Sequence, residues 1–241
     1  MAATMEKAPW QTQGEEKREA VREMFAEIAP TYDFANSVMS LRRHRRWRSQ
    51  AVSLLGLRAG DDALDICCGT GDFLAPLRRA VGPTGRIIGV DFCLPMLAVA
   101  ATKTRGHSSL GLGDACRLPI QSEAVDAITV GWGIRNTPNI DLAHAEAYRA
   151  LRTGGRFVSI DMALPRSAFL RAASRFVAHR LLPLLGSILG KRRAYTYLPK
   201  STETFLSREA LADSMRRAGF VDVTWSDRMA GNVCIHFGRK Q

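Results

Sequence analysis

The chain has 241 residues, of which 46% are hydrophobic and 24% are charged, and its formal net charge at pH 7 is +11. This composition is that of an ordinary soluble globule with one full core, and the positive charge predicts an anionic partner, either nucleic acid or an anionic membrane. The five cysteines are odd in number, and they include neither a C-x-x-C pair nor a partner pair of histidines. A disulfide framework and a zinc site are therefore excluded.

The beginning of the chain lacks the apolar segment of a signal peptide. The longest uncharged apolar stretch, residues 181–190, has about half of the roughly 20 residues that cross a bilayer. We therefore expect a cytoplasmic protein in a reducing compartment, with no transmembrane helix and no bound metal.

Two helices are expected first in chain order. Val21, Met24, Phe25 and Ile28 follow the i, i+3, i+4, i+7 pattern of a helix that ends before Pro30. A second helix should follow, and it carries five arginines within residues 42–48. We interpret these arginines as a solvent-exposed basic face.

From residue 59 onward, strand-like and helix-like segments alternate. Apolar runs at residues 63–68, 86–91, 127–132 and 156–162 have the length of buried parallel strands, and a short third strand should precede residue 113. Ser207 should cap a later helix, and the last two apolar runs should form a β-hairpin. The pattern predicts an α/β fold with a doubly wound, mostly parallel, seven-stranded sheet.

The loop after the first strand is the predicted ligand site, because ligands of such sheets lie at the carboxyl ends of the strands. Gly69, Thr70 and Gly71 form this loop, and glycines allow the backbone to approach a ligand closely. A dinucleotide fingerprint would need glycine where Leu74 stands, and no Gly-Lys-Ser/Thr of a phosphate-binding loop follows. An adenosine-type ligand without phosphates is therefore favoured.

Two acids behind this loop support the same conclusion. Asp91 ends the second strand, where a carboxylate can accept hydrogen bonds from both ribose hydroxyls. Asp114 follows the third strand, where it can meet the adenine ring. Cys67 and Cys68 finish the first strand, and we interpret them as small hydrophobic residues packed beside the loop.

The stretch from Asp65 to Asp72, together with Asp91, the run LPIQSEAVDAITVGWGIRN and the following LRTGGRF, resembles the class I S-adenosylmethionine-dependent methyltransferases. More specific matches are FAEIAPTYDFANSVMSLRRHRRWR, GIRN, YTYLPKS, AGF and GNVCIHFG. In this combination, from about residue 20 to the end, the chain is similar to the quinone-biosynthesis C-methyltransferases, which methylate the ring of demethylmenaquinol or of a ubiquinol precursor.

This resemblance implies S-adenosylmethionine as methyl donor and a lipophilic quinol as acceptor. The cofactor contacts that it implies are Asp65, Gly69, Thr70, Gly71, Asp91, Asp114, Ala115 and Gly131. The family often has serine at the position of Gly131, so only the backbone can contribute there. One domain is expected, with a helical cap at 1–58, a cofactor-binding core at 59–163, a helical substrate lid at 164–200, and a final helix and hairpin at 201–241.

The chemistry of such a reaction selects further candidates. A quinol carbon is a weak nucleophile until a neighbouring hydroxyl loses its proton, so a base or a cation must lie beside that hydroxyl. We predict that Arg135 stabilises the quinolate and that Asn136 orients a water or the loop. His44 and His236 are alternative bases, and Trp132 either stacks on the acceptor ring or is a half-buried core residue.

The segment from residue 166 to residue 193 has seven basic residues and no acid. Phe169, Ala173, Phe176 and Val177 follow helical spacing within it, which is the pattern of a helix on an anionic bilayer. We interpret it as a substrate lid with peripheral contact to the inner membrane face; the alternative is an amphipathic helix packed on its own core. Tyr195 and Tyr197, just beyond it, are predicted to line the quinol pocket.

Three different functions compete with this interpretation. A methyltransferase acting on nucleic acid would fit the charge, but GWGIRN replaces the motifs that base methylases carry after the fourth strand, so no nucleic-acid partner is expected. The sequence is also compatible with a methyltransferase for another small molecule and with a non-catalytic binder of the same fold. It leaves open whether the chain forms a homo-oligomer.

Overall fold

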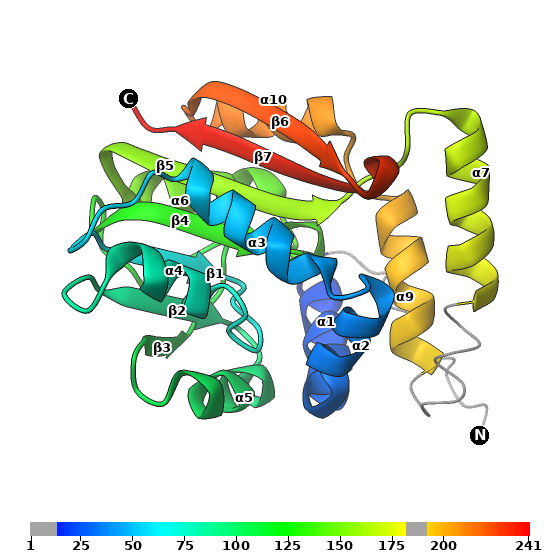
Figure 1. Ribbon diagram of the computed structural model, residues 1–241, viewed down its shortest axis with the longest axis horizontal. Helices are drawn as coiled ribbons and strands as arrows, with labels where there is room; N and C mark the ends of the chain where they lie inside the picture. The colour runs from blue at the N-terminus through cyan, green and yellow to red at the C-terminus, as the bar shows by residue number, and fades with distance from the viewer. Residues whose placement is uncertain (1–13, 182–191) are drawn as a thin grey trace.

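The computed structural model describes residues 14–181 and 192–241 and contains a seven-stranded sheet (Figure 1). The order of the strands is β3-β2-β1-β4-β5-β7-β6. They are β1 Ala63–Ile66, β2 Ile87–Asp91, β3 Ser109–Leu112, β4 Val125–Gly131, β5 Leu151–Met162, β6 Val221–Arg228 and β7 Val233–Arg239. The first five pair in parallel, whereas β7 is antiparallel to both β5 and β6. The predicted fold class is confirmed.

Helices cover both faces of this sheet. The helical elements are α1 Gly14–Ile28, η2 Ala29–Thr31, α2 Tyr32–Met39, α3 Arg43–Leu54, α4 Leu74–Val81, α5 Leu94–Thr104, η3 Ile134–Asn136, α6 Ile140–Ala150, α7 Ala168–Phe176, η4 Val177–Leu181, α9 Arg192–Glu203, α10 Arg208–Arg217 and η5 Met229–Gly231. Side-chain caps begin two of them, because Asn139 accepts a hydrogen bond from the backbone N–H of Leu142, and Ser207 accepts one from that of Ala210.

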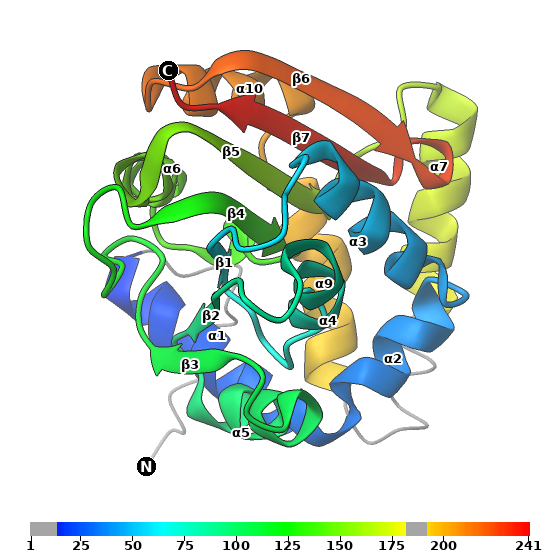
Figure 2. The same cartoon turned by 60° about the vertical axis from the view of Figure 1, so that its left-hand side comes forward.

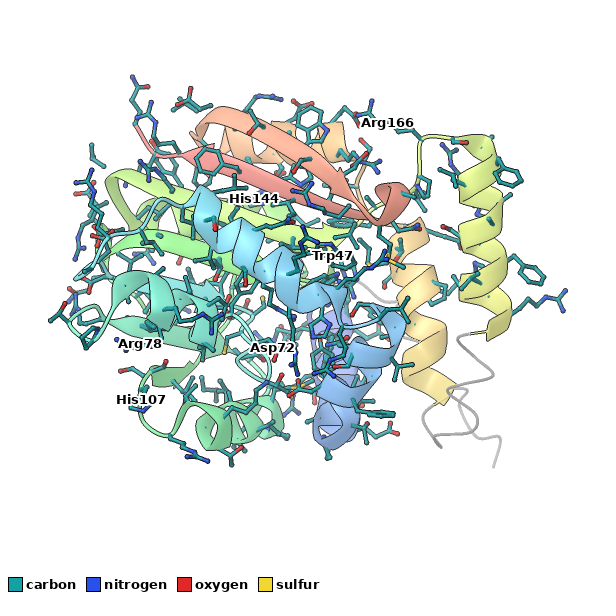
Figure 3. The ribbon with its side chains drawn as sticks, in the orientation of Figure 1. Trp47, Asp72, Arg78, His107, His144 and Arg166 are labelled. Atoms are coloured by element: carbon teal, nitrogen blue, oxygen red, sulfur yellow. The ribbon has the colours of Figure 1, made fainter. Side chains whose placement is uncertain are left out.

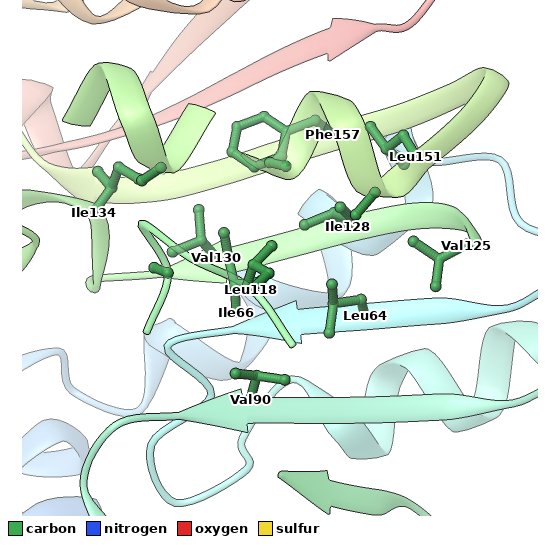
Figure 4. Packing of buried hydrophobic residues seen from close by; sticks show 14 of the residues in the cluster. Leu64, Ile66, Val90, Leu118, Val125, Ile128, Val130, Ile134, Leu151 and Phe157 are labelled. Atoms are coloured by element: carbon green, nitrogen blue, oxygen red, sulfur yellow. The ribbon is translucent and has the colours of Figure 1, made fainter. Parts of the chain in front are cut away.

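The core has two layers, one on each face of the sheet. Leu64, Ile66 and Phe157 pack on one face against α6 and α10, and Figure 4 shows this cluster from close by. Ala63 and Val158 point the other way and pack against α3 and α4. Because the central parallel strands are covered on both faces, β1 is buried at all four of its positions and β4 at five of its seven.

The N-terminal helices and the segment after β5 gather at one end of the sheet. Figure 1 shows α1, α2, α9 and α7 beyond the ends of the strands rather than over a face, and Figure 2 shows α2 and α7 on the same flank of the molecule. Within the two described ranges, no helix combines the length and the apolar character needed to cross a bilayer.

The local structure differs from the sequence-based expectation at two turns. The first strand ends at Ile66 and not at Cys68, because Cys67 has a left-handed backbone with φ of 52°. The second helix is divided into α2 and α3, because Leu41 and Arg42 both have positive φ. Such conformations are uncommon for residues other than glycine, so side-chain patterning does not reveal them. The stretch 182–191 of the predicted lid lies outside the described residues.

Candidate active site

A cleft opens at the carboxyl ends of β1, β2 and β4, and we call it the nucleoside cleft. Its walls include five of the predicted cofactor residues: Gly69, Asp91, Asp114, Ala115 and Gly131. Phe25 and Tyr32, from the N-terminal helices, close its outer side. The cleft is narrow, with a cavity volume of about 50 Å³.

Asp91 is the acid at the centre of this cleft. Its Oδ2 accepts a hydrogen bond of 2.8 Å from the backbone N–H of Gly69, and its Oδ1 accepts one of 2.9 Å from that of Cys93. Burial raises the pKa of Asp91 to about 6, against the opposing effect of these N–H donors. A carboxylate offers about four acceptor positions, so Asp91 braces the glycine loop and retains capacity for a ligand.

Asp114 is held from both sides at the far end of the cleft. Its Oδ1 accepts a hydrogen bond of 2.8 Å from the backbone N–H of Cys116. Its Oδ2 lies 3.1 Å from Nη1 of Arg18, which belongs to α1. Helix α1 is therefore tied across the cleft by an ion pair.

Three predicted cofactor residues lie behind the cleft and not in its walls. Asp65 is 1% exposed and accepts a hydrogen bond of 2.7 Å from Thr129 on β4, and burial raises its pKa to about 8. Thr70 donates a hydrogen bond of 2.5 Å to Asp33 of α2. Gly71 has a positive φ, and a Cβ added there would lie 3.0 Å from Leu74 and 3.2 Å from Ala100. These residues hold the loop, and direct contact with a cofactor stays a prediction for them.

Close packing fixes the small residues at this end of the sheet. A Cβ on Gly131 would lie 2.6 Å from Phe73, and one on Gly133 would lie 2.4 Å from Cys67. Burial raises the pKa of the thiols of Cys67 and Cys68, which is the behaviour of packed and unreactive cysteines. Among the described residues, no group of three or more His, Cys, Asp or Glu side chains could hold a metal ion.

A second chamber lies beside the first, and we call it the apolar cavity. Its volume is about 410 Å³, and α1, α2, α3, α7 and β7 contribute mainly apolar walls, among them Met24, Met39, Trp47, Leu170 and Val233. Phe25, Tyr32 and Trp132 line both chambers. The nucleoside cleft and the apolar cavity therefore meet at three aromatic side chains.

Arg135 lies on η3 in the wall of the apolar cavity and is 8% exposed. Its Nη1 donates to Oδ1 of Asp161, at 2.6 Å, and to the carbonyl oxygen of Trp132, at 2.7 Å. Burial alone would lower the pKa of Arg135, but the carboxylate of Asp161 holds that pKa above its ordinary value. The guanidinium stays charged, so Arg135 can stabilise an anion but cannot act as a base.

Asn136 and Tyr197 extend this network. Nδ2 of Asn136 donates to the carbonyl oxygen of Trp132, at 3.0 Å, and Oδ1 of Asn136 accepts a hydrogen bond of 2.7 Å from the hydroxyl of Tyr197. Tyr197 belongs to α9 and lines the apolar cavity, and burial raises its pKa to about 12. Tyr195 lies on the same helix, but its side chain is outside the described part of the chain.

The basic run at residues 42–48 contains a residue that the sequence interpretation misplaced. Arg42, Arg43, Arg45 and Arg46 are exposed, as expected. The interpretation is wrong for Arg48, which is 5% exposed and lines the apolar cavity. Trp47 and Ala51 are buried on the same face of α3 as Arg48. This helical spacing is the sequence signal that could have predicted the burial of Arg48.

The two candidate histidines occupy different surroundings. His44 is buried in the wall of the apolar cavity, its Nδ1 lies 2.5 Å from Oγ of Ser40, and burial lowers its pKa to about 4. His236 lies on β7, and its Nε2 contacts the carbonyl oxygen of Arg208 at 3.0 Å. His236 lines neither the nucleoside cleft nor the apolar cavity, and its packing within the fold accounts for its position.

The sheet order, with an antiparallel β7 between β5 and β6, and the cleft at the carboxyl ends define the class I methyltransferase fold. A SAM-dependent methyltransferase from Thermotoga maritima has this fold, with a TM-score of 0.65 and 21% identity over 91% of this chain and 99% of that one. Phosphoethanolamine N-methyltransferase 2 of Haemonchus contortus, solved with S-adenosyl-L-methionine, has a TM-score of 0.61 and 14% identity over 81% of this chain and 52% of that one.

Residues 11–240 match the ubiE/COQ5 methyltransferase family, and the chain belongs to this family. It is 41% identical to the demethylmenaquinone methyltransferase of Roseiflexus sp. strain RS-1, over 94% of this chain and 96% of that protein. It is 35% identical to the enzyme of the same name from Alkalihalophilus pseudofirmus, over 93% and 97%. The predicted family resemblance is confirmed.

Proposed function

We propose that this protein is an S-adenosylmethionine-dependent C-methyltransferase that methylates the ring of a polyprenyl quinol, with demethylmenaquinol as its acceptor. The junction of the two chambers carries the proposal. Phe25, Tyr32 and Trp132 separate a cleft of nucleoside type from an apolar cavity, so a donor methyl and an acceptor carbon can meet there. The relatives named above support the choice of the naphthoquinol over a ubiquinol precursor.

In this proposal the nucleoside cleft holds the methyl donor. Asp91 accepts hydrogen bonds from the ribose, and Ala115 and Asp114 contact the adenine ring. The sulfonium lies toward the junction of the two chambers at Phe25, Tyr32 and Trp132, so its methyl group points to the apolar cavity. Helix α1 covers the donor and keeps water away from the reacting atoms.

The acceptor ring lies in the apolar cavity, whose volume is in the range of small-molecule sites. A ring hydroxyl loses its proton to water, and the ring carbon beside it forms a bond to the methyl group. The sulfur–methyl bond breaks with its electron pair on sulfur, which leaves neutral S-adenosylhomocysteine. The ring C–H proton then leaves, and the oxygen is protonated again, so one proton is released overall. Arg135 stabilises the quinolate, and Asn136 orients the loop and the water that takes the proton.

The outer faces of α2 and α7 support contact with a membrane, from which a polyprenyl quinol would come. Phe34 is 61% exposed at α2, and Phe169 and Phe176 are 80% and 64% exposed on α7. Both helices also line the apolar cavity, and no residue of α7 is buried. Exposed arginines accompany these side chains: Arg42, Arg43, Arg45, Arg46, Arg171, Arg175 and Arg180. An apolar rim with a basic surround is suited to an anionic bilayer, so we place the enzyme at the cytoplasmic face of the inner membrane.

The test is a comparison of acceptors. The protein is incubated with methyl-labelled S-adenosylmethionine and either a short-chain demethylmenaquinol, a benzoquinol precursor, or total RNA. We expect label in the naphthoquinol product. Label in the benzoquinol or RNA would reassign the acceptor, and cofactor binding without any transfer would identify a non-catalytic binder.

A further inference from the structure

A second buried guanidinium faces the apolar cavity from α3. Arg48 is 5% exposed, and its guanidinium carbon lies 4.7 Å from the centre of the Trp132 ring and 5.6 Å from that of Phe73. Trp132 is one of the three side chains that both chambers share. Arg48 therefore places a positive charge at the junction where the acceptor carbon and the donor methyl would meet.

Two hydrogen-bond donors of this guanidinium are unused. Nη1 of Arg48 lies 3.1 Å from Oδ2 of Asp72, which Figure 3 labels beneath α3. Neither this Nη1 nor the buried Nε has a hydrogen-bond partner among the described residues. Buried donors are nearly always paired in proteins, so the guanidinium of Arg48, a residue of the cavity wall, is incompletely paired within the protein and suited to an additional acceptor from a ligand.

The charge of Arg48 is also less completely balanced than that of Arg135. The carboxylate of Asp72 pairs with two cations at once. Nζ of Lys103 lies 2.6 Å from its Oδ1, and Nη1 of Arg48 lies near its Oδ2. Among the described ion pairs, Asp161 pairs with Arg135 alone. The positive charge of Arg48 is therefore less fully neutralised by a carboxylate of the protein than that of Arg135, so it attracts an anion in the cavity more strongly.

We propose that Arg48 binds the ring oxygen of the acceptor and stabilises the negative charge that this oxygen carries once its hydroxyl has lost its proton and until the methyl is transferred. This inference rests on the proposed function and deepens it. The hydroxyl proton leaves to water, the ring electron pair forms the new carbon–carbon bond, and the oxygen regains a proton when the ring C–H proton is lost. Arg48 gives up no proton in this sequence; it holds the oxygen while it is anionic, and Arg135 acts beside it.

The test compares Arg48→Gln and Arg48→Lys with Arg79→Gln, which changes an exposed arginine of α4. Initial rates are measured with a short-chain demethylmenaquinol kept reduced, as a function of pH, and the dissociation constant of S-adenosylmethionine is measured by calorimetry. We expect Arg48→Gln to lower kcat by roughly 10²–10³-fold, as loss of an oxyanion donor does, with cofactor affinity unchanged.

The pH–rate profile separates this role from packing. Without the guanidinium, the bound hydroxyl should ionise at higher pH, so the rise of kcat should move to alkaline pH in Arg48→Gln. Arg48→Lys should keep part of the rate and should shift less, and it carries the test if Arg48→Gln folds poorly. Arg79→Gln should match the wild type.

An unshifted pH profile, with any loss of kcat matched by a loss of cofactor binding or of folded protein, would overturn the inference and make Arg48 a packing residue. A wild-type enzyme that methylates no quinol at all would instead reject the proposed function, and this inference with it. If the wild type methylates the quinol and the pH–rate profile of Arg48→Gln is unshifted, the role of Arg48 is rejected and the proposed function stands.

Discussion

Tyr197 of α9 donates a hydrogen bond of 2.7 Å to Asn136, which follows β4. This contact joins α9 to the loop that carries Arg135, so one wall of the apolar cavity depends on both. Tyr197→Phe keeps the ring and removes the hydroxyl. We expect the free energy of unfolding to fall by about 1 kcal/mol, as for a typical buried hydrogen bond, and kcat to fall with it. Thermal unfolding and initial rates measure this, and an unchanged kcat would show that the contact is only structural.

Asp91 should govern the pH dependence of cofactor affinity. Its pKa is raised to about 6 in the folded protein, so the carboxylate that accepts the ribose hydroxyls is lost as the pH falls through 6. S-adenosylmethionine should bind more weakly below that pH. Asp91→Ala should weaken binding by about 1.5–3 kcal/mol at neutral pH, the range for hydrogen bonds to charged groups. Calorimetry on either side of pH 6 checks both, with the exposed Asp213→Ala as control; unaltered affinity in Asp91→Ala would refute the ribose assignment.

Arg135 should affect turnover more than cofactor binding. Arg135→Ala would leave Asp161 buried without its partner, at a cost of about 3–5 kcal/mol in the free energy of unfolding. Arg135→Lys retains the positive charge and loses the two-directional contact with Asp161 and the carbonyl of Trp132, so it should remain folded. We expect a kcat lower by about 10-fold or more, since the ammonium of lysine does not replace the planar guanidinium, and an unchanged dissociation constant for S-adenosylmethionine. Equal losses in both quantities would reject a role at the acceptor.

Arg18 should control how the donor enters. Its ion pair with Asp114 is partly exposed, so Arg18→Ala should change the free energy of unfolding by no more than about 1 kcal/mol. Release of α1 from the far end of the cleft should, however, raise both the association and the dissociation rate of S-adenosylmethionine. Stopped-flow measurements check this against Arg22→Ala, whose partner Glu19 lies on α1 itself. Identical rates in the two variants would show that α1 does not gate the cleft.

The exposed phenylalanines of α7 should mediate membrane contact. The double variant Phe169→Ser and Phe176→Ser removes apolar area from the rim of the cavity and leaves the arginines in place. We expect less protein to float with anionic liposomes and a larger effect of salt on what remains, because only electrostatic attraction is left. Leu142→Ser, which changes an exposed leucine of α6, is the control. Flotation equal to that of the wild type would exclude these two residues from the membrane contact.

The sequence alone was sufficient to predict the strands, the glycine loop and the family. These depend on short-range properties: apolar runs of strand length, glycines where the backbone turns, and motifs that are contiguous in the chain. The same short range explains what patterning missed locally, since the left-handed backbone at Leu41, Arg42 and Cys67 leaves no mark in the alternation of apolar and polar residues.

Only the tertiary structure decided which charged residues face the two chambers. In the sequence, Arg48 does not differ from its exposed arginine neighbours. Its burial follows from contacts with Trp132 and Asp72, which come from distant parts of the chain. The register of β1 and β4 places Asp65 beside Thr129, a partner that lies 64 residues away in the sequence. The burial and the partners of a long or charged side chain are properties of what packs around it, and segments far apart in the sequence supply those neighbours.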